Sequence, residues 1–313
     1  MNRRVLSVGR YFVPALMIAC WTTATIPRAA HAAEAAILMV DVDGLATSTD
    51  CTGVSGAFTT IQAAVNAATP GDTIQICPGH YDEQVVVTKS NLTIQGSGTA
   101  VTVLRPTAVA QNTTAIFSGA PAKPILLVNG ANNVAIGSLT IDGSGADSGS
   151  AVFPQCPIVG FYMGIYYRNS SGTINAAHVT NMTSSTLCGL GIRAEAANVR
   201  VTTNLVDRYG DAGISCAGPG TQCLVTGNTV RGQGPVTDHT QGGIDVRNQA
   251  GAKISGNIIT DHFLIGAKGV PESSVGILLS LAQPSSEPHL LQENVFANNQ
   301  VNVQRNGSAA AAK

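Results

Sequence analysis

Short stretches in which polar and apolar residues alternate recur along most of the chain. One kind begins with Gly-Ile, and the other begins with Asn followed within two positions by an apolar residue. The Gly-Ile stretches begin at Gly164, Gly191, Gly213, Gly243 and Gly276, and the Asn stretches begin at Asn204, Asn228, Asn257 and Asn294. Alternation with a period of two predicts β-strands, and its repetition predicts a solenoid in which each repeat forms one coil.

The spacing of the two kinds of stretch divides each coil into a nearly constant part and a variable part. From Gly to the following Asn the chain takes 13, 15, 14 and 18 residues, whereas the return to the next Gly takes 9, 15 and 19. The first part predicts two strands and a tight corner, where we expect the Asn side chains to bond to the neighbouring coil. The second part predicts a loop that can lengthen without disturbing the stack. The content of Gly, Val, Thr and Asn disfavours helical repeats.

A different pattern occurs before the repeats, at residues 58–68. Ile61, Ala64, Val65 and Ala68 fall on one helical face, and Thr59 or Thr60 precedes it as a suitable N-cap. We expect a short helix that covers the first coil, which would otherwise expose strand edges. The early strands are expected at residues 73–77, 84–87, 91–96, 101–104, 125–128 and 134–141.

Four segments near the start of the chain resemble a known superfamily. They are residues 58–65, Pro70-Gly71-Asp72 with the two residues that follow, Pro78-Gly79-His80-Tyr81, and residues 91–96. They are similar to the opening of right-handed parallel β-helix proteins of the pectin-lyase-like superfamily. The resemblance implies an all-β, right-handed parallel β-helix over residues 33–306 with a short N-terminal capping helix. It leaves activity open, because the superfamily includes lyases, esterases, polygalacturonases, epimerases and many uncharacterised secreted proteins.

The first 32 residues have the composition of an export signal. Basic residues precede an apolar run at residues 11–21, and Ala30-His31-Ala32 forms a small-residue cleavage site. A lipoprotein signal ending at Cys20 is the alternative. Cleavage after residue 32 removes four of the 17 basic residues and none of the 18 acidic ones, which leaves a net charge of −5. We therefore expect a secreted or periplasmic protein without a membrane span or a nucleic-acid partner, ending in a flexible tail at residues 307–313.

Composition narrows the class further. Charged residues make up 11% of the chain and aromatic residues 4%, which excludes a coiled coil and disfavours disorder. Six cysteines remain after removal of the signal, an even number that fits disulfides in an oxidising compartment. Their spacing is poor for zinc. Pairing of nearest neighbours predicts the bridges Cys51–Cys77, Cys156–Cys188 and Cys216–Cys223.

Charged residues gather on the strands that begin with Gly-Ile. If the Ile side chain points inward, the next residue and the one two beyond it point outward. The first outward column then contains Tyr166, Arg193, Ser215, Asp245 and Leu278, and the second contains Arg168, Glu195, Ala217, Arg247 and Ser280. In the superfamily that the chain resembles, ligands lie along these strands. The columns therefore predict a groove for an extended polysaccharide, with the alternative that they form a ladder of surface ion pairs in a non-catalytic adhesion or structural solenoid.

The residue types in the columns suggest a lyase more than a hydrolase. β-Elimination needs a cationic group to neutralise a uronate carboxylate and a base to remove the adjacent proton. The candidate catalytic residues are Arg247, Arg193 and Asp245, with Arg247 or Arg193 expected to act as the base. The candidate substrate-binding residues are Tyr166, which would stack on sugar, Arg168, Glu195 and the loop residue His239. Hydrolysis needs two carboxylates about 5–9.5 Å apart, whereas Glu195 and Asp245 are expected two coils apart.

Metal chemistry has weaker support in the sequence. Asp245 or Glu195 is a candidate Ca²⁺ ligand, whereas Asp41-x-Asp43-Gly44 fits a turn better than a calcium loop. Some periplasmic β-helix proteins deliver copper, which needs thioether or imidazole ligands. Beyond the signal, the chain has only Met39, Met163 and Met182 and five scattered histidines. The sequence therefore disfavours a copper-delivery role.

Overall fold

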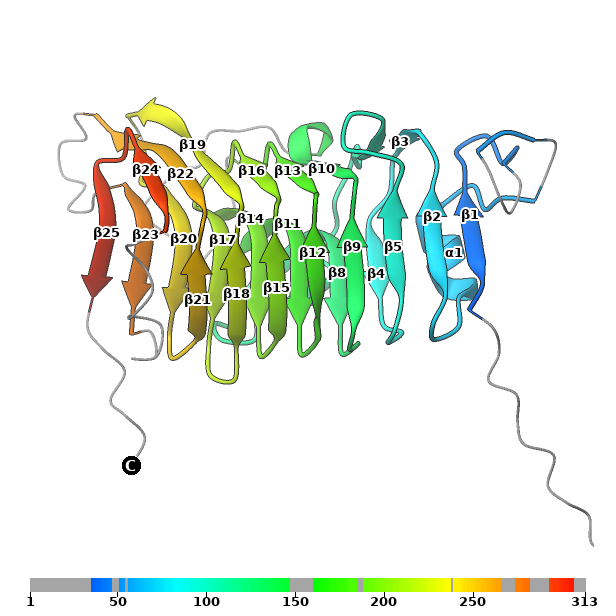
Figure 1. The fold of residues 1–313 in the computed structure, drawn as a ribbon, viewed down its shortest axis with the longest axis horizontal. Helices are drawn as coiled ribbons and strands as arrows, with labels where there is room; N and C mark the ends of the chain where they lie inside the picture. The colour runs from blue at the N-terminus through cyan, green and yellow to red at the C-terminus, as the bar shows by residue number, and fades with distance from the viewer. Residues whose placement is uncertain are drawn as a thin grey trace, which may run out of the picture. The chain divides into compact units, whose positions relative to one another are not determined.

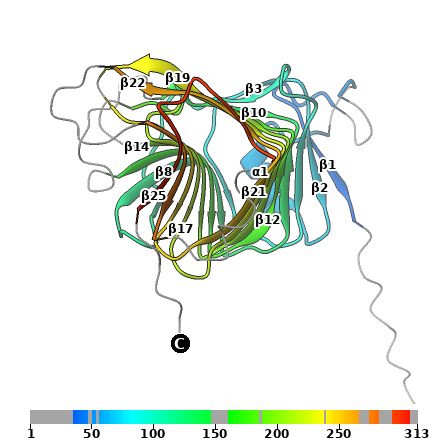
Figure 2. The same ribbon diagram turned by 60° about the vertical axis from the view of Figure 1, so that its left-hand side comes forward.

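The chain folds as a right-handed parallel β-helix, as the sequence predicted. The computed structural model describes residues 35–46, 51–53, 56–146, 160–184, 188–237, 239–265, 274–281 and 293–306. Its strands form three sheets, here called A, B and C, and successive coils lie side by side along the stack (Figure 1). Viewed obliquely, the three sheets surround a single interior (Figure 2). The export signal expected at residues 1–32 and the tail expected at residues 307–313 lie outside the described residues.

Each sheet takes one short strand from each coil, and neighbouring strands pair in parallel. Sheet A contains β1 (Ile37–Val40), β2 (Thr73–Ile76), β5 (Thr93–Gly96), β9 (Val134–Gly137), β12 (Ser171–Asn175), β15 (Asn198–Thr202), β18 (Gln222–Thr226) and β21 (Gly251–Ser255). Sheet B contains β3 (Gly79–Tyr81), β6 (Thr102–Leu104), β10 (Thr140–Asp142), β13 (His178–Thr180), β16 (Leu205–Asp207), β19 (Thr229–Val236), β22 (Ile258–Leu264) and β24 (Val295–Ala297). Sheet C contains β4 (Val85–Val87), β8 (Pro121–Asn129), β11 (Phe161–Arg168), β14 (Cys188–Glu195), β17 (Ala212–Ala217), β20 (Gly242–Arg247), β23 (Val275–Ser280) and β25 (Val301–Asn306). Two short elements lie outside this scheme, the strand β7 (Thr113–Thr114), which pairs antiparallel with β8, and the 3₁₀ turn η1 (Gly143–Gly145).

The core is built from identical positions of successive coils. The isoleucines of the Gly-Ile stretches pair with one another across sheet C, and all are almost completely buried. They are Ile165, Ile192, Ile214, Ile244 and Ile277. Because identical residues of neighbouring coils lie in register, each coil buries the apolar face of the next coil. A single coil could not bury its own apolar face.

The glycines before these isoleucines form a second column, where sheet C approaches sheet B. A Cβ on Gly191 would lie 2.4 Å from the carbonyl oxygen of Gly213, and one on Gly243 would lie 2.4 Å from that of Gly276. The same added atom would meet a side chain of sheet B, Val206 in the case of Gly191 at 2.5 Å. Real Cβ contacts are never this short, so only glycine fits the column.

The asparagines form the predicted ladder at the corner between sheets A and B. Asn228 Oδ1 accepts hydrogen bonds from the backbone N–H and the side-chain amide of Asn204, both at 3.0 Å. Asn257 does the same for Asn228, and Asn294 does the same for Asn257. Because Asn204, Asn228 and Asn257 are buried, each bond also satisfies a polar group that has lost contact with water.

A short helix, α1 (Ile61–Ala67), packs at the start of the stack, as expected (Figure 2). Thr60 is its N-cap and accepts a hydrogen bond from the backbone N–H of Ala63 at 3.2 Å. Glu83 adds a second cap by accepting from two further N–H groups of the first turn, at 2.6 and 2.9 Å. The predicted apolar face of the helix is buried in the main core.

Two of the three predicted disulfides are present. Cys51 bonds to Cys77, and Cys216 bonds to Cys223. Cys188 is disulfide-bonded as well, whereas Cys156, its expected partner, lies outside the described residues. In the part of the chain that the structure describes, no helix is long and apolar enough to cross a membrane.

Candidate functional site on the outer face of sheet C

The two predicted columns do stand side by side on sheet C. Tyr166 pairs with Arg193, and the same line continues through Ser215, Asp245 and Leu278. The second line runs from Arg168 through Glu195, Ala217, Arg247 and Ser280 in the same register. The outward side chains have different surroundings along the sheet: those on β11 and β14 are covered by another segment of the chain, whereas Arg247 on β20 is partly exposed to solvent.

Residues 113–120, here called the cover segment, lie over the outer face of β11 and β14. The segment comprises β7 and the turn that returns to β8. Two predicted site residues hold it in place: Glu195 Oε2 accepts a hydrogen bond from the backbone N–H of Ile116 at 2.5 Å, and Arg168 Nε donates to the carbonyl of Thr114 at 3.0 Å. Ala115 and Ala120 pack with Tyr166 in an apolar cluster outside the main core.

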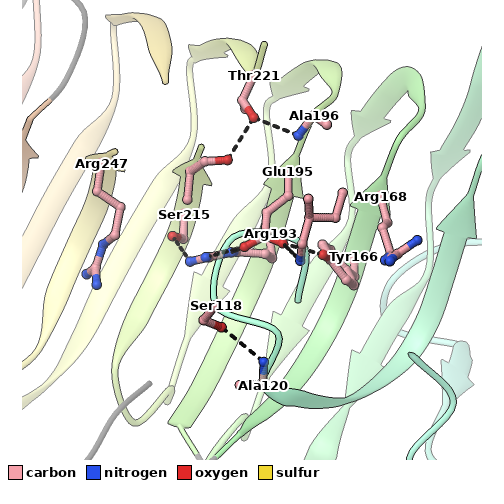
Figure 3. Close-up of polar contacts among 12 residues, drawn as sticks. Ser118, Ala120, Tyr166, Arg168, Arg193, Glu195, Ala196, Ser215, Thr221 and Arg247 are labelled. Atoms are coloured by element: carbon pink, nitrogen blue, oxygen red, sulfur yellow. Dashed lines mark hydrogen bonds and ion pairs between the residues drawn. The ribbon is translucent and has the colours of Figure 1, made fainter. Parts of the chain in front are cut away.

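Below the cover segment, three predicted site residues and Ser215, from the first outward column, are linked by hydrogen bonds (Figure 3). The hydroxyl of Tyr166 donates to Glu195 Oε2 at 2.5 Å, and Arg193 donates to Glu195 Oε1 through Nε at 3.1 Å and Nη2 at 2.5 Å. Arg193 Nη1 donates to Ser215 Oγ at 2.7 Å. The Arg193 guanidinium also lies over the ring of Phe161, 5.3 Å from its centre.

This network corrects the expectation that its members line an open groove. Tyr166, Arg193 and Glu195 have exposed fractions of 0%, 4% and 1%. Burial, followed by the negative charge of Glu195, raises the pKa of the Tyr166 hydroxyl far above its ordinary value. Tyr166 therefore cannot stack on a sugar in this arrangement, and the substrate contacts expected of Glu195 and Arg168 are replaced by contacts with the cover segment.

The outer face of sheet C becomes partly exposed to solvent at β20. The side chain of Arg247 is 29% exposed and forms an ion pair with Asp245, whose side chain is 1% exposed. Asp245 Oδ1 is buried and has no hydrogen-bond partner among the described residues. A buried carboxylate oxygen without a partner is costly, so this atom is suited to accept a hydrogen bond from a water or a bound hydroxyl.

An exposed aromatic ring borders the same stretch. Phe117, on the cover segment, is 52% exposed. Its Cβ lies 3.8 Å from the position that a Cβ on Gly218 would take, and the backbone N–H of Gly218 donates to the carbonyl of Arg247. Sequence reasoning chose Tyr166 as the aromatic contact and missed Phe117, because nothing in the alternation shows where the cover segment lies.

Asp211 is a further residue that sequence reasoning missed. It directly precedes β17 and is half-buried. Burial raises the pKa of its carboxyl above the ordinary value; the negative charge of Asp245 adds to the rise, while Arg247, Arg193 and His239 oppose it. These charges show that Asp211 belongs to the same electrostatic environment as Asp245 and Arg247. His239, predicted as a loop residue at the groove, is 2% exposed.

The candidate calcium ligands do not come together. Glu195 is bonded to Arg193, and Asp245 is bonded to Arg247 two coils further on. Among the residues with described positions, no group of three or more His, Cys, Asp or Glu side chains is arranged to hold a metal ion. The Asp41–Gly44 segment forms a turn in which the backbone N–H of Gly44 donates to the carbonyl of Asp41 at 2.9 Å, as expected.

Comparison with known proteins identifies the family. The model of a family described as periplasmic copper-binding protein (NosD) matches residues 82–312. The chain belongs to the NosD family. No curated protein sequence matches this NosD-family chain. The disulfides fit the periplasmic location in the family's description.

Solved β-helix structures are similar to this NosD-family chain in fold. Pectin methylesterase from carrot is 15% identical, with 88% of this chain and 83% of that chain covered and a TM-score of 0.42. Pectin methylesterase PemA from Erwinia chrysanthemi is 13% identical, with coverage of 83% and 92% and a TM-score of 0.41. Alginate lyase from Paenibacillus sp. str. FPU-7 is 14% identical, with coverage of 77% and 96% and a TM-score of 0.33. At these identities the likeness concerns the fold alone.

Proposed function

We propose that this NosD-family chain binds an extended acidic polysaccharide across the outer face of sheet C, at the stretch bounded by Arg247 and Phe117. The observation that carries the proposal is the partly exposed Arg247 beside an exposed aromatic ring, on a chain otherwise poor in both residue types. A guanidinium binds a uronate carboxylate through paired N–H donors, and an aromatic ring offers a rigid apolar surface to a sugar face. Asp245, whose side chain is 1% exposed, contributes by holding the Arg247 guanidinium in place through their ion pair.

The same residues suit β-elimination on the bound polymer. In that reaction a base takes the proton from the carbon next to the carboxylate, a carbon–carbon double bond forms, and the glycosidic carbon–oxygen bond breaks. Arg247 is paired with Asp245 and stays protonated, so it is suited to neutralise the uronate carboxylate and not to act as the base. Asp211 is a better candidate for the base than Arg247, because burial raises the pKa of its carboxyl and it lies in the same electrostatic environment as Arg247. The leaving oxygen takes a proton from water.

Arg193 is the weaker of the two predicted catalytic arginines. Its donors are directed to Glu195 and Ser215, and its side chain is 5% exposed. A substrate could reach it only by displacing the cover segment. This internal bonding also favours the second candidate function, a non-catalytic structural or adhesion solenoid, because it shows that charged side chains on sheet C can serve the fold alone.

A copper site does not fit the described residues. Met39, Met163 and Met182 are buried in three separate apolar clusters. His262 uses one ring nitrogen towards Tyr209 and the other towards Asn299 at 2.8 Å, and His178 bonds to Asp207 at 3.1 Å. Copper prefers thioether and imidazole ligands that converge on one point, and these residues do not converge. We therefore derive no copper chemistry for the described part of the chain.

Binding is tested with the purified protein and a panel of soluble polyuronates, such as polygalacturonate and alginate, by isothermal titration calorimetry. Arg247→Gln and Phe117→Ala should each weaken binding by about tenfold, which corresponds to about 1.4 kcal/mol. The matched controls are Arg200→Gln, an exposed arginine on sheet A, and Phe263→Ala, an exposed phenylalanine on sheet B. No binding to any polyuronate, or equal losses in the controls, would overturn the proposal in favour of the structural solenoid.

Cleavage is tested separately by following the ultraviolet absorbance of unsaturated product. Asp211→Asn should abolish product formation while leaving polymer affinity within about twofold, because the substitution removes the base and keeps the shape. Binding without product in the wild-type protein would reject the lyase step and retain the binding function.

A further inference from the structure

A pocket of about 400 Å³ lies away from the Arg247 stretch, at the corner where the chain leaves sheet B. It is bounded by the ends of three successive coils, with Asn181 and Thr183 after β13, Asp207 and Arg208 at the end of β16, and Arg231 and Gln233 in β19. Its volume falls in the range of small-molecule sites, about 300–1,000 Å³. Six of its seven lining residues have polar side chains, the exception being Gly232, which is unusual for a gap left by imperfect apolar packing.

Two arginines on neighbouring coils give the pocket its charge. Arg231 is 55% exposed and lies 3.9 Å from Asp261, a distance at the limit of an ion pair. Arg208 is exposed and forms no hydrogen bond or ion pair with the described residues, although its charge lowers the pKa of Asp207. Asp207 Oδ1 already has a hydrogen-bond partner in His178, whose Nε2 lies 3.1 Å away. Arg208 therefore has no ion-pair or hydrogen-bond partner among the described residues, and Arg231 has only a long ion pair with Asp261.

The backbone at Arg208 has a conformation that recurs at the corners of the coils. Arg208 has a φ of +51°, in the left-handed region, and Asn181 occupies the equivalent corner one coil earlier with a φ of +57°. Asn and Gly adopt this conformation at low cost, whereas other residues pay about 1–2 kcal/mol. Ala176, Ala196 and Thr203 also have positive φ values at corners of this solenoid, so the conformation belongs to the corner, and Asn is a replacement that Arg208 tolerates there.

The remaining groups suit a ligand that carries hydroxyls. Asn181, Thr183 and Gln233 bring amide and hydroxyl groups to the pocket wall. The carboxylate of Asp207 is an acceptor for hydroxyl donors, and as an anion it disfavours a bare anion such as sulfate. The combination selects for a molecule with a single anionic group and several hydroxyl groups.

We propose that this pocket binds a small hydroxylated anion, a single sugar acid or a sugar phosphate, with its anionic group between Arg208 and Arg231 and its hydroxyls against Asp207 and the amides. This site goes beyond the proposed function, since it lies on another corner of the coil and uses none of the residues of the Arg247 stretch. The shared chemistry is an anionic group flanked by hydroxyls, and the two arms of the experiment distinguish carboxylate from phosphate.

The test is a calorimetric or NMR titration of the full protein with glucuronate and with glucose 6-phosphate, alongside glucose and inorganic sulfate. At least one of the two hydroxylated anions should bind about tenfold or more tightly than both glucose and sulfate. Arg208→Asn and Arg231→Gln should each weaken that binding by about tenfold, while Arg200→Gln leaves it unchanged. Asn suits the left-handed corner better than Arg, so Arg208→Asn should unfold at or above the wild-type midpoint, which separates lost binding from lost folding.

The tighter of the two anions identifies the ligand class, and either result supports the site. Equal binding of sulfate, equal binding of glucose, or unchanged affinity in both arginine variants would overturn it, as would no binding of either hydroxylated anion. Arg247→Gln serves as the second control, because it should weaken polymer binding and leave the titration of this pocket unchanged. Failure at the pocket is thereby distinguishable from failure of the proposed polysaccharide function.

Discussion

The two halves of the outer face of sheet C share one register and yet have opposite environments. On β11 and β14, Tyr166, Arg193 and Glu195 are buried under the cover segment and bond to one another. On β20, Asp245 is paired with an Arg247 side chain that is 29% exposed. The direction of a side chain follows from the local alternation of the strand, whereas its exposure depends on a segment contributed by another coil. Equal positions in a solenoid therefore need not have equal roles.

The largest expected effect is the loss of the buried carboxylate. Glu195→Gln removes the charge that faces Arg193 and replaces one of the two carboxylate oxygens with an NH2 group, so the side chain can no longer accept both from Arg193 and from the backbone N–H of Ile116. Breaking a buried ion pair by removing one partner costs about 3–5 kcal/mol, because the remaining charge stays buried without compensation. Chemical denaturation should show a decrease of this size in the free energy of unfolding.

The matched control for that variant is Glu293→Gln, which neutralises an exposed glutamate and should change the free energy of unfolding by no more than about 0.5 kcal/mol. Should both variants unfold at the same denaturant concentration, the carboxylate does not hold the cover segment and the contrast between the two halves is lost.

Tyr166→Phe tests a single bond of the covered half. The hydroxyl of Tyr166 donates to an ionised carboxylate, and hydrogen bonds to charged groups contribute about 1.5–3 kcal/mol. Tyr167→Phe is the comparison on the same strand, because the hydroxyl of Tyr167 donates to the neutral carbonyl of Val134 at 2.7 Å and should contribute about 0.5–1.5 kcal/mol. Thermal or denaturant unfolding of both variants gives the two values, and a larger loss for Tyr167→Phe would contradict the ionised network.

Asp211 provides a smaller effect whose size depends on pH. Its pKa in the folded state is raised above the ordinary value of 3.8, so the ionised form is disfavoured by folding. Its contribution to stability is fully present below pH 3.8 and is lost as the pH rises through the raised pKa. Asp211→Asn should therefore be more stable than the wild type at pH 7, and the gain should shrink as the pH falls towards 3.8. Unfolding midpoints across this range check the sign, and a gain that is constant with pH would exclude titration of Asp211 as its cause.

The smallest expected effect belongs to Phe117. Because its ring is 52% exposed, Phe117→Ala should change the free energy of unfolding by no more than about 0.5 kcal/mol. Denaturant unfolding measures it alongside the variants above. A loss of several kcal/mol would show that the ring anchors the cover segment, and the exposed stretch near Arg247 would then owe its shape to Phe117.

The sequence was sufficient for the fold because its signals are local and repeated. Each Gly-Ile stretch predicts one strand, and five in succession predict the column in sheet C. The asparagines recur at one corner, and only a stack of coils brings such residues together. The helix at residues 61–67 follows from an apolar face and a Thr60 cap. None of these inferences requires knowledge of how a distant segment folds.

Only part of the candidate site could be predicted, because the exposure of its side chains depends on a segment that lies far from them in the sequence. The outward columns were correct in register, but the cover segment has no alternation that shows which strands it covers. The short β7 pairs antiparallel with β8. The chain that follows β7 lies over β14, where the backbone N–H of Ile116 donates a hydrogen bond to the Glu195 side chain. Asp211 was missed because it precedes the Gly-Ile motif and so falls outside the count of outward positions.

The glycine column beside the core isoleucines has a consequence for how such a molecule can change its length. A coil fits against its neighbours only if it carries a hydrogen atom where Gly191 and Gly243 stand, because a carbonyl oxygen of the following coil occupies the space of a methyl group. The solenoid can therefore be lengthened by duplicating whole coils that keep this glycine. An insertion of part of a coil within a strand would prevent the close contact between neighbouring coils. The spiral thus grows in discrete steps, and residues can be gained or lost freely in the loops that lead from sheet B to sheet C and not at the corner that carries the asparagine ladder.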